Sequence, residues 1–315
     1  MKNYTVRKYQ KTDYALWNDF IHQAKNATFL FHRDFMEYHS DRFEDFSLLV
    51  LDGTKLVCVL PANRKGDEIF SHQGLTYGGF VTQEKLKSEA VSAVVDAVIA
   101  FLREQQFKNL FLKQLPTFYA SGGKQQTDWF LFQRGAVLYR KDMNLAVNLN
   151  QPLTISKSKL KHFRRVSEFD LSYKQTDDFA SFWNLVLLPR LSEKYDVKPV
   201  HSLEEIEKLQ RIFPQQIKQF SVYHHDEIVA GITVFESDWV VKSQYGATTK
   251  LGEQLRALDY LFIHLLEHYQ KRGKHFFDMG TVHENGGQNV NWGLLNQKEE
   301  LGCSVYNQDF YTLEL

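Results

Sequence analysis

Residues 239–252 read WVVKSQYGATTKLG, and residues 275–287 read HFFDMGTVHENGG. The apolar run in each segment predicts a strand, and the apolar spacing between them predicts a helix that ends at Gly273. The expected order is therefore strand, glycine-marked turn, helix, strand and Gly-rich loop. A glycine-marked turn that leads into a helix can present backbone N–H groups to an anion. We expect an anion site where this helix begins.

The first half of the chain repeats this pattern. Tyr77-Gly78-Gly79 precedes a predicted helix and strand, just as Tyr245-Gly246-Ala247 does 168 residues later. The segment GAVLY at Gly135 matches GCSVY at Gly302, 167 residues later. Two matches at nearly one offset predict a duplicated domain. With the boundary at Asn150-Gln151-Pro152, we predict one domain over residues 1–150 and a second over residues 151–315.

Composition narrows the class of protein. The chain has 315 residues, enough for two domains, and its 38 Lys and Arg are balanced by 38 Asp and Glu. This balance gives no net field to attract nucleic acid or a membrane surface. No apolar run is long enough to span a bilayer, and two cysteines predict neither a disulfide framework nor a zinc site. We expect a cytoplasmic protein with no metal, no nucleic-acid partner and no membrane partner.

Both halves are predicted to run strand, two helices, three antiparallel strands, helix, strand, helix and strand. In the first half we place the third antiparallel strand at 69–80, followed by a helix capped by Thr82 and a final hairpin that ends at Leu149. In the second half a basic helix at 156–166 precedes the strand at 170–174. The segment at 224–227, His-His-Asp-Glu, lies between two strands and predicts a hairpin turn rather than a metal site.

This order of elements resembles that of GNAT-type N-acyltransferases, and the duplication resembles tandem-GNAT and Fem-like proteins. The motifs that carry the resemblance are YGAT at 245–248, LG at 251–252, FDMG at 277–280, NWGL at 291–294, KEELG at 298–302 and the Lys/Arg-rich helix at 156–165. The resemblance covers essentially the whole chain. It implies an α+β fold of two GNAT-like domains, each a mixed, mainly antiparallel sheet flanked by helices. Within the group, the chain is most similar to bacterial enzymes that acylate an amino sugar carried on a nucleotide diphosphate.

The phosphate loop departs from the usual GNAT pattern. Thr249 stands where Gln or Arg is expected, and Gln254 stands where a second small residue is expected. The matching loop of the first half, 82–85, has no glycine. The second domain is therefore the one expected to bind acyl-CoA.

The resemblance implies a coenzyme A site in the second domain, with amides at 246–256 facing the pyrophosphate. The expected cofactor-binding residues are Tyr245, Gly246, Gly252, Gln254, Leu255, Arg256 and Asn291. The alternative is that Gly246 and Gly252 only make a turn. No permanently bound cofactor is expected, because acyl-CoA acts as a co-substrate.

The general base has two candidate positions. His72 lies in a polar, glycine-broken segment, and a neutral imidazole can accept the proton of an attacking amine. His283 and Glu284 lie in the Gly-rich loop after a strand, where α/β proteins commonly bind ligands. A structural histidine and a solvated loop are the respective alternatives. Asp278 is interpreted as a structural carboxylate that binds loop N–H groups.

The acceptor is expected to enter between the two domains. The predicted substrate-binding residues are Gln73, Tyr77, Lys113, Arg164 and Arg165. Arg164 and Arg165 belong to the basic helix, which can hold a diphosphate or simply form a solvated face.

These features favour an N-acyltransferase that moves an acyl group from acyl-CoA to the amine of a small acceptor, such as a nucleotide-linked amino sugar. One alternative is Fem-like aminoacyl transfer from a charged tRNA to a peptidoglycan precursor, although the chain lacks the long helical-hairpin arm usual in those proteins. Another is a binding protein that kept the fold without catalysis. The sequence leaves the oligomeric state open.

Overall fold

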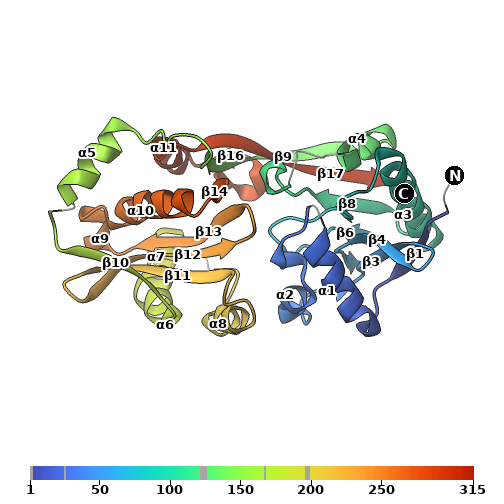
Figure 1. Cartoon of the computed structure of the whole chain (residues 1–315), viewed down its shortest axis with the longest axis horizontal. Helices are drawn as coiled ribbons and strands as arrows, with labels where there is room; N and C mark the ends of the chain where they lie inside the picture. The colour runs from blue at the N-terminus through green and yellow to red at the C-terminus, as the bar shows by residue number, and fades with distance from the viewer. Residues whose placement is uncertain (1–2, 25, 121–125, 167, 196–198) are drawn as a thin grey trace. The chain divides into compact units, whose positions relative to one another are not determined.

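The computed structural model describes residues 3–24, 26–120, 126–166, 168–195 and 199–315, with the side chains of Lys194 and Tyr195 left out (Figure 1). The chain forms two compact units. Unit 1 comprises Met1–Asp142 with Asn307–Leu315, and unit 2 comprises Met143–Tyr306. The boundary predicted at residues 150 and 151 lies inside unit 2, directly after the strand β9 (Val137–Asn148).

Unit 1 contains two sets of strands. The order β1-β3-β4-β7 forms a four-stranded sheet, and β17, β8, β6, β5 and β2 are consecutive neighbours in a second sheet. The strands are β1 (Thr5–Lys8), β2 (Glu44–Asp45), β3 (Leu48–Asp52), β4 (Lys55–Leu60), β5 (Asn63–Lys65), β6 (Glu68–Phe70), β7 (Val81–Thr82), β8 (Asn109–Lys113) and the end of β17 (Ser304–Glu314). The helices are α1 (Tyr14–Gln23), α2 (Arg33–Met36), α3 (Ser88–Glu104) and α4 (Gln126–Gln133).

Three predictions for the first half are wrong. The segment 69–80 is not one strand: β6 ends at Phe70, and a loop with left-handed backbone at His72 (φ 65°) and Gly79 (φ 91°) separates it from β7. Thr82 belongs to β7, and Lys87 occupies the N-cap of α3. The expected hairpin ending at Leu149 is instead the single 12-residue strand β9.

Unit 2 carries a sheet in the order β10-β11-β12-β13-β14-β9. Its strands are β10 (Leu171–Thr176), β11 (Ile217–His224), β12 (Glu227–Glu236), β13 (Val240–Thr248), β14 (Phe276–Thr281) and the end of β9, with a small hairpin of β15 (His283–Glu284) and β16 (Asn289–Val290). Its helices are α5 (Lys157–Val166), α6 (Phe179–Phe182), a π-helical turn at Trp183–Leu187, α7 (Leu188–Tyr195), α8 (Leu203–Ile212), α9 (Lys250–Gln254), α10 (Ala257–Lys271) and α11 (Trp292–Glu300). The predicted helices and strands of this half are present, and the predicted α+β class with mainly antiparallel pairing is confirmed.

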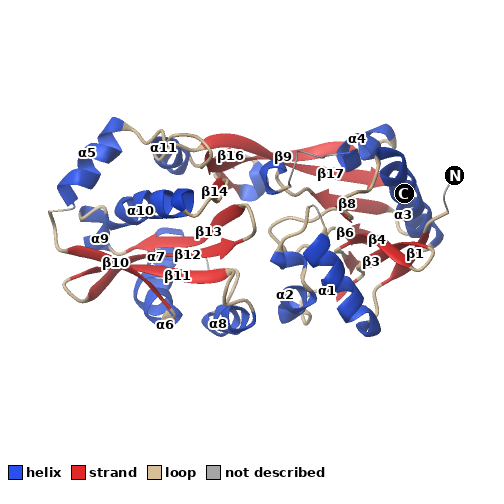
Figure 2. Cartoon of the chain, viewed as in Figure 1, coloured by secondary structure: helices blue, strands red, loops and turns tan. Residues whose placement is uncertain are grey.

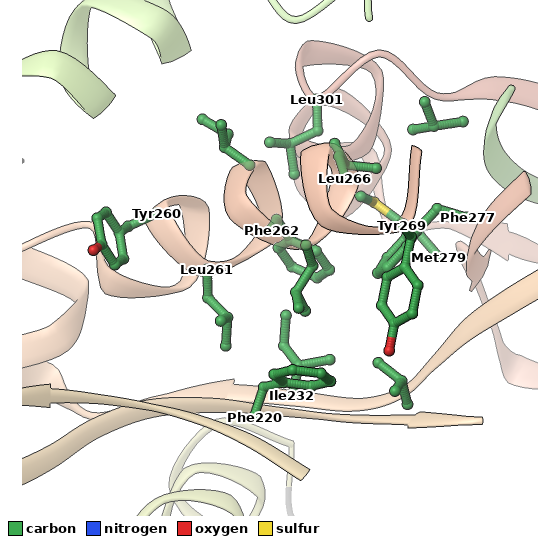
Figure 3. Close-up of a cluster of buried hydrophobic side chains, with 14 of the residues drawn as sticks. Phe220, Ile232, Tyr260, Leu261, Phe262, Leu266, Tyr269, Phe277, Met279 and Leu301 are labelled. Atoms are coloured by element: carbon green, nitrogen blue, oxygen red, sulfur yellow. The ribbon is translucent and has the colours of Figure 1, made fainter. Parts of the chain in front are cut away.

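Helices cover both faces of the unit 2 sheet. α10 lies along one face, and α6, α7 and α8 lie on the other (Figure 2). Leu261 and Tyr269 of α10 point toward the strands that carry Phe220 and Ile232 (Figure 3). Burial of such side chains stabilises a fold by about 1.5–3 kcal/mol each. This cluster fixes α10, and therefore the loop before it, against β12 and β13.

The two matching glycines have one structural role. Gly135 (φ 86°) follows α4 and precedes β9, and Gly302 (φ 93°) follows α11 and precedes β17. Each adopts the left-handed backbone that glycine tolerates at a helix end. Residues 144–148 of β9 pair with β14 in unit 2, whereas residues 310–314 of β17 pair with β8 in unit 1.

Gly252 is required for close packing. A Cβ atom there would lie 2.2 Å from the Val229 carbonyl oxygen and 2.4 Å from Thr248 Oγ1, whereas at Gly293 it would meet nothing closer than 3.6 Å. We expect Gly252→Ala to lower the free energy of unfolding by about 1–3 kcal/mol through overpacking. Gly293→Ala, in helix α11, should be neutral or stabilising by up to about 1 kcal/mol. Urea unfolding of both variants checks this, and equal stability of the two would contradict it.

Candidate functional site

The candidate site is a fork between β13 and β14 in unit 2. The two strands pair in parallel at only three positions, the last of them Lys242 with Asp278. Beyond that pair, β13 continues to Thr248 and β14 to Thr281 without pairing to each other in the described register. Residues 243–248 therefore form a strand edge that β14 does not cover. The backbone N–H and C=O groups on this edge can pair with an extended ligand. We call residues 243–248 and 279–281 the fork.

A bulge marks the start of the fork. Thr233 of β12 pairs with Tyr245 and Val234 pairs with Ser243, so Gln244 is the extra residue of β13. A bulge bends its strand and redirects side chains, and it commonly lies next to a functional site. The bulge explains how β13 departs from β14 at this point.

A cavity of about 460 Å³ occupies the fork. Its walls come from β13, β14 and helices α5, α7, α9, α10 and α11. The lining residues are Lys159, Arg190, Leu191, Ser243, Gln244, Gly246, Ala247, Thr248, Gly252, Glu253, Arg256, Leu258, Asp259, Phe262, Met279, Leu294, Gln297, Lys298 and Leu301. Four of these side chains are cationic and two are carboxylates, so the pocket suits a ligand with negative charge.

The loop at the mouth of this pocket differs from an open phosphate loop. Residues 250–254 form helix α9, and Thr249 caps it by accepting a hydrogen bond from Gly252 N at 3.0 Å. Glu253 N donates to Thr249 O, and Leu255 N donates to Leu251 O. The amides predicted to face a pyrophosphate are thus partly used inside the protein. Gly252 lines the pocket. A glycine is needed at this position because the Val229 carbonyl oxygen leaves no room for a Cβ atom.

Charged pairs hold the walls together. Lys159 Nζ of α5 lies 2.6 Å from Asp259 Oδ2 of α10, and both side chains are largely buried. Arg190 of α7 donates to Glu253 at 2.8 Å. Arg256 has left-handed backbone (φ 55°) between α9 and α10. These pairs link four helices around the cavity.

Lys298 is the most unusual group in the pocket. Its residue is 7% exposed, and its Nζ donates to the carbonyl oxygens of Gly280 at 3.1 Å and Thr281 at 2.9 Å. Burial lowers the pKa of Lys298 to about 8, and the nearby charge of Lys242 lowers it further, while Asp278 opposes the shift. An ammonium has three N–H donors. Two of them bond the β14 turn, and Lys298 also lines the cavity.

Asp278 shapes the turn that holds Lys298. Its Oδ1 accepts hydrogen bonds from Gly280 N at 2.7 Å and Asn144 Nδ2 at 2.8 Å, and its Oδ2 lies 3.2 Å from Lys242 Nζ. As predicted, the Asp278 carboxylate accepts a hydrogen bond from a loop N–H, that of Gly280.

A second polar network lies beside β13. Tyr245 Oη lies 2.6 Å from His201 Nδ1 and accepts a hydrogen bond from His201 N at 3.1 Å. Burial raises the pKa of Tyr245 to about 12, and a hydrogen bond from the Gln244 side chain acts in the opposite direction. The Tyr245 ring packs edge-on against Trp183 at 5.2 Å. Tyr245, predicted to bind the cofactor, does not line the cavity among the described residues, whereas Gln244 does.

The structure places His72 in unit 1, in an environment that does not fit a general base. The residue is 4% exposed, and its ring stacks on His39 with centroids 5.2 Å apart. Burial lowers the pKa of His72 to about 3, and the charges of His39 and Arg33 add to this. Such an imidazole is too weak a base to take a proton from an amine near neutral pH.

The other predicted base candidates lie in the hairpin after β14. His283 is half-buried, and no partner for its Nδ1 is found within the described residues. Glu284 is exposed, and its Oε1 accepts a hydrogen bond from Asn291 Nδ2 at 2.8 Å. Asn291 also caps α11 by accepting from Leu294 N. Asn291 therefore has a helix-capping role. His283, Glu284 and Asn291 are not among the described residues that line the cavity.

The predicted substrate-binding residues fall in different places. In unit 1, Gln73 is bonded to Asn63 through N and Oε1 (2.7 and 3.0 Å), and the buried Tyr77 donates to Thr28 at 3.0 Å. Lys113 Nζ lies 5.8 Å from the Phe310 ring centroid. In unit 2, Arg164 and Arg165 are exposed on α5.

The remaining predicted cofactor residues lie near the mouth. Gly246 and Arg256 line the pocket; Gln254, an exposed residue, and Leu255, which is half-buried, do not. The sequence prediction missed Lys298, Lys159, Asp259 and Gln244 as pocket residues. Two of them lie in segments that the sequence analysis quotes as family motifs: Lys298 in KEELG at 298–302, and Lys159 in the Lys/Arg-rich helix at 156–165.

Among the described residues, no group of three or more His, Cys, Asp or Glu is arranged to hold a metal ion. A search of the same part of the chain finds no helix with the length and apolar character needed to cross a bilayer.

Solved structures resemble this chain along nearly its whole length. The FemX crystal structure superposes with a TM-score of 0.71 at 9% identity, covering 99% of this chain and 97% of FemX. L-PGS from Bacillus licheniformis gives 0.63 at 12% identity, covering 97% and 92%. A tandem GNAT protein from the clavulanic acid biosynthesis pathway gives 0.53 at 11% identity, covering 99% and 98%.

The chain has the tandem GNAT fold. At these identities the likeness establishes the fold alone. Neither a protein-family model nor a curated protein sequence matches the chain.

His72 should make unfolding sensitive to acid. Its folded pKa of about 3 lies below the ordinary value of 6.5, so its contribution to stability is lost as pH falls from 6.5 toward 3. We expect His72→Asn, which tolerates left-handed backbone, to flatten the fall in unfolding free energy over this range by up to about 1.4 kcal/mol per pH unit.

The matched control is His225→Asn, an exposed histidine that also has left-handed backbone (φ 50°). Urea unfolding at several pH values between 4.5 and 6.5 measures the effect. Equal pH dependence in His72→Asn and the unmodified protein would refute the assignment.

Proposed function

We propose that the chain is an N-acyltransferase that moves an acyl group from acyl-CoA to the amine of a small acceptor, at the fork of unit 2. The observation that carries this proposal is the buried ammonium of Lys298 beside an unpaired strand edge in a cationic pocket. The edge of residues 243–248 suits an extended pantetheine arm, which carries amide groups that can pair with a strand. Lys298 suits the carbonyl oxygen of the thioester.

The chemistry follows from these contacts. A neutral amine attacks the thioester carbonyl, a C–N bond forms, and negative charge develops on oxygen. The third N–H of Lys298 stabilises that oxyanion. The C–S bond then breaks, and its electron pair leaves with sulfur as a thiolate. The amine proton passes to a base, for which we propose His283 or Glu284 in the hairpin after β14.

The acceptor is proposed to be a nucleotide-linked amino sugar. The basic helix α5 supports this, because Arg164 and Arg165 are exposed and none of the described carboxylates forms an ion pair with either. Such side chains bind diphosphates through paired N–H groups. Lys159 of the same helix lines the cavity, so α5 brings cationic charge close to the reaction site.

A second candidate donor is an aminoacyl-tRNA, as in the Fem-like reading of the sequence. Two observations favour this donor. The backbone amides at the mouth of the pocket are partly hydrogen-bonded within α9, which leaves fewer of them for a pyrophosphate. In addition, this chain covers 97% of the FemX chain, so FemX has no large segment that this chain lacks. The missing helical arm therefore does not count against this donor. Acetyl-CoA and an alanyl-ester RNA minihelix, offered separately with an amine, distinguish the two donors by which one is consumed.

Lys298→Met should lower kcat by about 100-fold or more, the usual cost of removing one oxyanion donor. Lys271→Met, an exposed lysine at the end of α10, serves as the control and should retain activity. The measurement is the thiol released from acetyl-CoA in the presence of an amine. An unchanged kcat in Lys298→Met would contradict the proposed role.

The pH profile provides an independent check. Because the pKa of Lys298 is lowered to about 8, its ammonium is lost as pH rises through 8, and kcat should fall on that alkaline limb. The residual activity of Lys298→Met should lack this limb. An alkaline limb at the same pH in both enzymes would assign it to another group.

A further inference from the structure

A second cavity of unit 2 adjoins the fork. Its volume is about 370 Å³, and its walls come from the π-helical turn, α7, the start of β12 and the segment from the end of β13 into α9. Arg190 and Thr248 line both this cavity and the cavity in the fork. The two cavities therefore meet at these two residues. We call the second one the α7–α9 cavity.

The open edge of β13 leads from Lys298 to this second cavity. Gly280, whose carbonyl oxygen accepts a hydrogen bond from Lys298 Nζ, lies two residues beyond the last pair of β13 and β14. Thr248 lies six residues beyond that pair on β13. At a rise of about 3.3 Å per residue, the edge continues for about 13 Å past the level of Lys298. A ligand that follows this edge leaves the fork at Thr248, where the α7–α9 cavity begins.

Aliphatic side chains supply much of the wall of the α7–α9 cavity. Leu185 and Leu251 are 61% and 39% exposed, and Pro189 and Ile228 line the same space. Aliphatic surface that is open to water at a cavity can cover the faces of a planar ring system. Glu227 also lines the cavity, and its carboxylate can accept a hydrogen bond from the amino group of an adenine.

Two cations lie at this cavity in pairs that a ligand can replace. Lys250 Nζ lies 3.0 Å from Glu193 Oε1, and Arg190 donates to Glu253 at 2.8 Å. The Glu193 and Glu253 side chains are 51% and 58% exposed, and exposed ion pairs contribute little to stability. A phosphate can therefore take the place of either carboxylate. The two cations provide donors where the α9 amides are partly used within the protein.

We propose that the α7–α9 cavity binds the nucleotide half of the acyl-CoA donor, with the adenine against the aliphatic side chains and the phosphates on Arg190 and Lys250. This inference rests on the proposed function and adds a second subsite to it. The backbone of a pantetheine arm is about as long as four residues of extended peptide, so the arm spans the edge from Lys298 to Thr248.

The position of the cavity also separates the two candidate donors. In an aminoacyl-tRNA the terminal adenosine is esterified directly to the aminoacyl group. With the ester carbonyl at Lys298, that adenosine lies inside the fork, about 13 Å short of Thr248. Only a donor with a long arm between its acyl group and its adenosine places the adenosine in the α7–α9 cavity.

A shortened donor tests the assignment. With an amino sugar as acceptor, Leu185→Asp should raise the KM for acetyl-CoA about tenfold or more, because it removes aliphatic contact and places a negative charge beside the phosphates. The KM for acetylpantetheine, which lacks the nucleotide, should be unchanged. The matched control is Leu188→Asp. Leu188 is 37% exposed and is not among the described residues that line either cavity, so both KM values should stay the same.

Lys250→Met supplies a second variant on α9. The Lys250 side chain is 77% exposed, so its loss should not disturb the fold. It should raise the KM for acetyl-CoA by a smaller factor than Leu185→Asp, because one phosphate contact is lost and no repulsive charge is added. The KM for acetylpantetheine should again be unchanged.

Binding of ADP, which carries the adenine and the diphosphate without the arm, gives a readout that needs no turnover. Titration calorimetry should detect ADP binding to the unmodified protein and to Leu188→Asp, and its loss in Leu185→Asp. No ADP binding to the unmodified protein, equal ADP affinity in Leu185→Asp, or equal rises in KM for both donors would overturn the inference and leave the proposed function standing. Failure of the unmodified enzyme to acylate any amine from acetyl-CoA or acetylpantetheine would overturn the proposed function, and the inference with it.

Discussion

The separation of β13 from β14 is the constraint on which the rest of the site depends. Pairing stops after Lys242 and Asp278, and the Asp278 carboxylate binds the amide of Gly280 and the ammonium of Lys242. Those bonds turn β14 so that the carbonyl oxygens of Gly280 and Thr281 face Lys298. The bulge at Gln244 bends β13 at the same level. Without this divergence β13 and β14 would pair along their whole length, and the 460 Å³ cavity would close.

The residues around the fork carry more positive than negative charge, which favours an anionic ligand. Lys242 and Lys298 share one close carboxylate, Asp278, and the buried pair of positive charges is one reason the pKa of Lys298 is lowered. A buried cation that is incompletely neutralised costs folding free energy. In the proposed reaction, the same surplus would stabilise the negative charge that develops on the thioester oxygen.

Local rules in the sequence predicted most of unit 2. The apolar stripe of α10 and the glycine that ends this helix each act within a few residues, so they are visible in a single chain. The repeated segments at Gly135 and Gly302, from which a duplication was predicted, form equivalent helix-to-strand turns. The pairing of β9 with β14 and of β17 with β8 depends on contacts between distant segments, which no local pattern records. The loop at 71–80 resembles a strand in sequence because Leu75, Tyr77 and Phe80 are apolar, and these side chains are buried although the backbone forms no continuous strand.

The site was harder to predict for a related reason. Lys298 lies in a charged stretch that is typical of an exposed helix face, and only its burial against the β14 turn distinguishes it. Gln244 belongs to no motif, since its place in the cavity wall depends on the bulge in β13. His72 attracted attention as a histidine in a polar segment, yet that segment wraps around His39 and buries the ring.

The most direct test of the account is a crystal structure of the protein with a non-hydrolysable acetyl-CoA analogue in which a methylene group separates the sulfur from the carbonyl. The account predicts the pantetheine arm along residues 243–248 of β13 and the analogue's carbonyl oxygen within hydrogen-bond distance of Lys298 Nζ. An analogue bound away from the fork, or a fork that stays empty at saturating concentrations of the analogue, would contradict it.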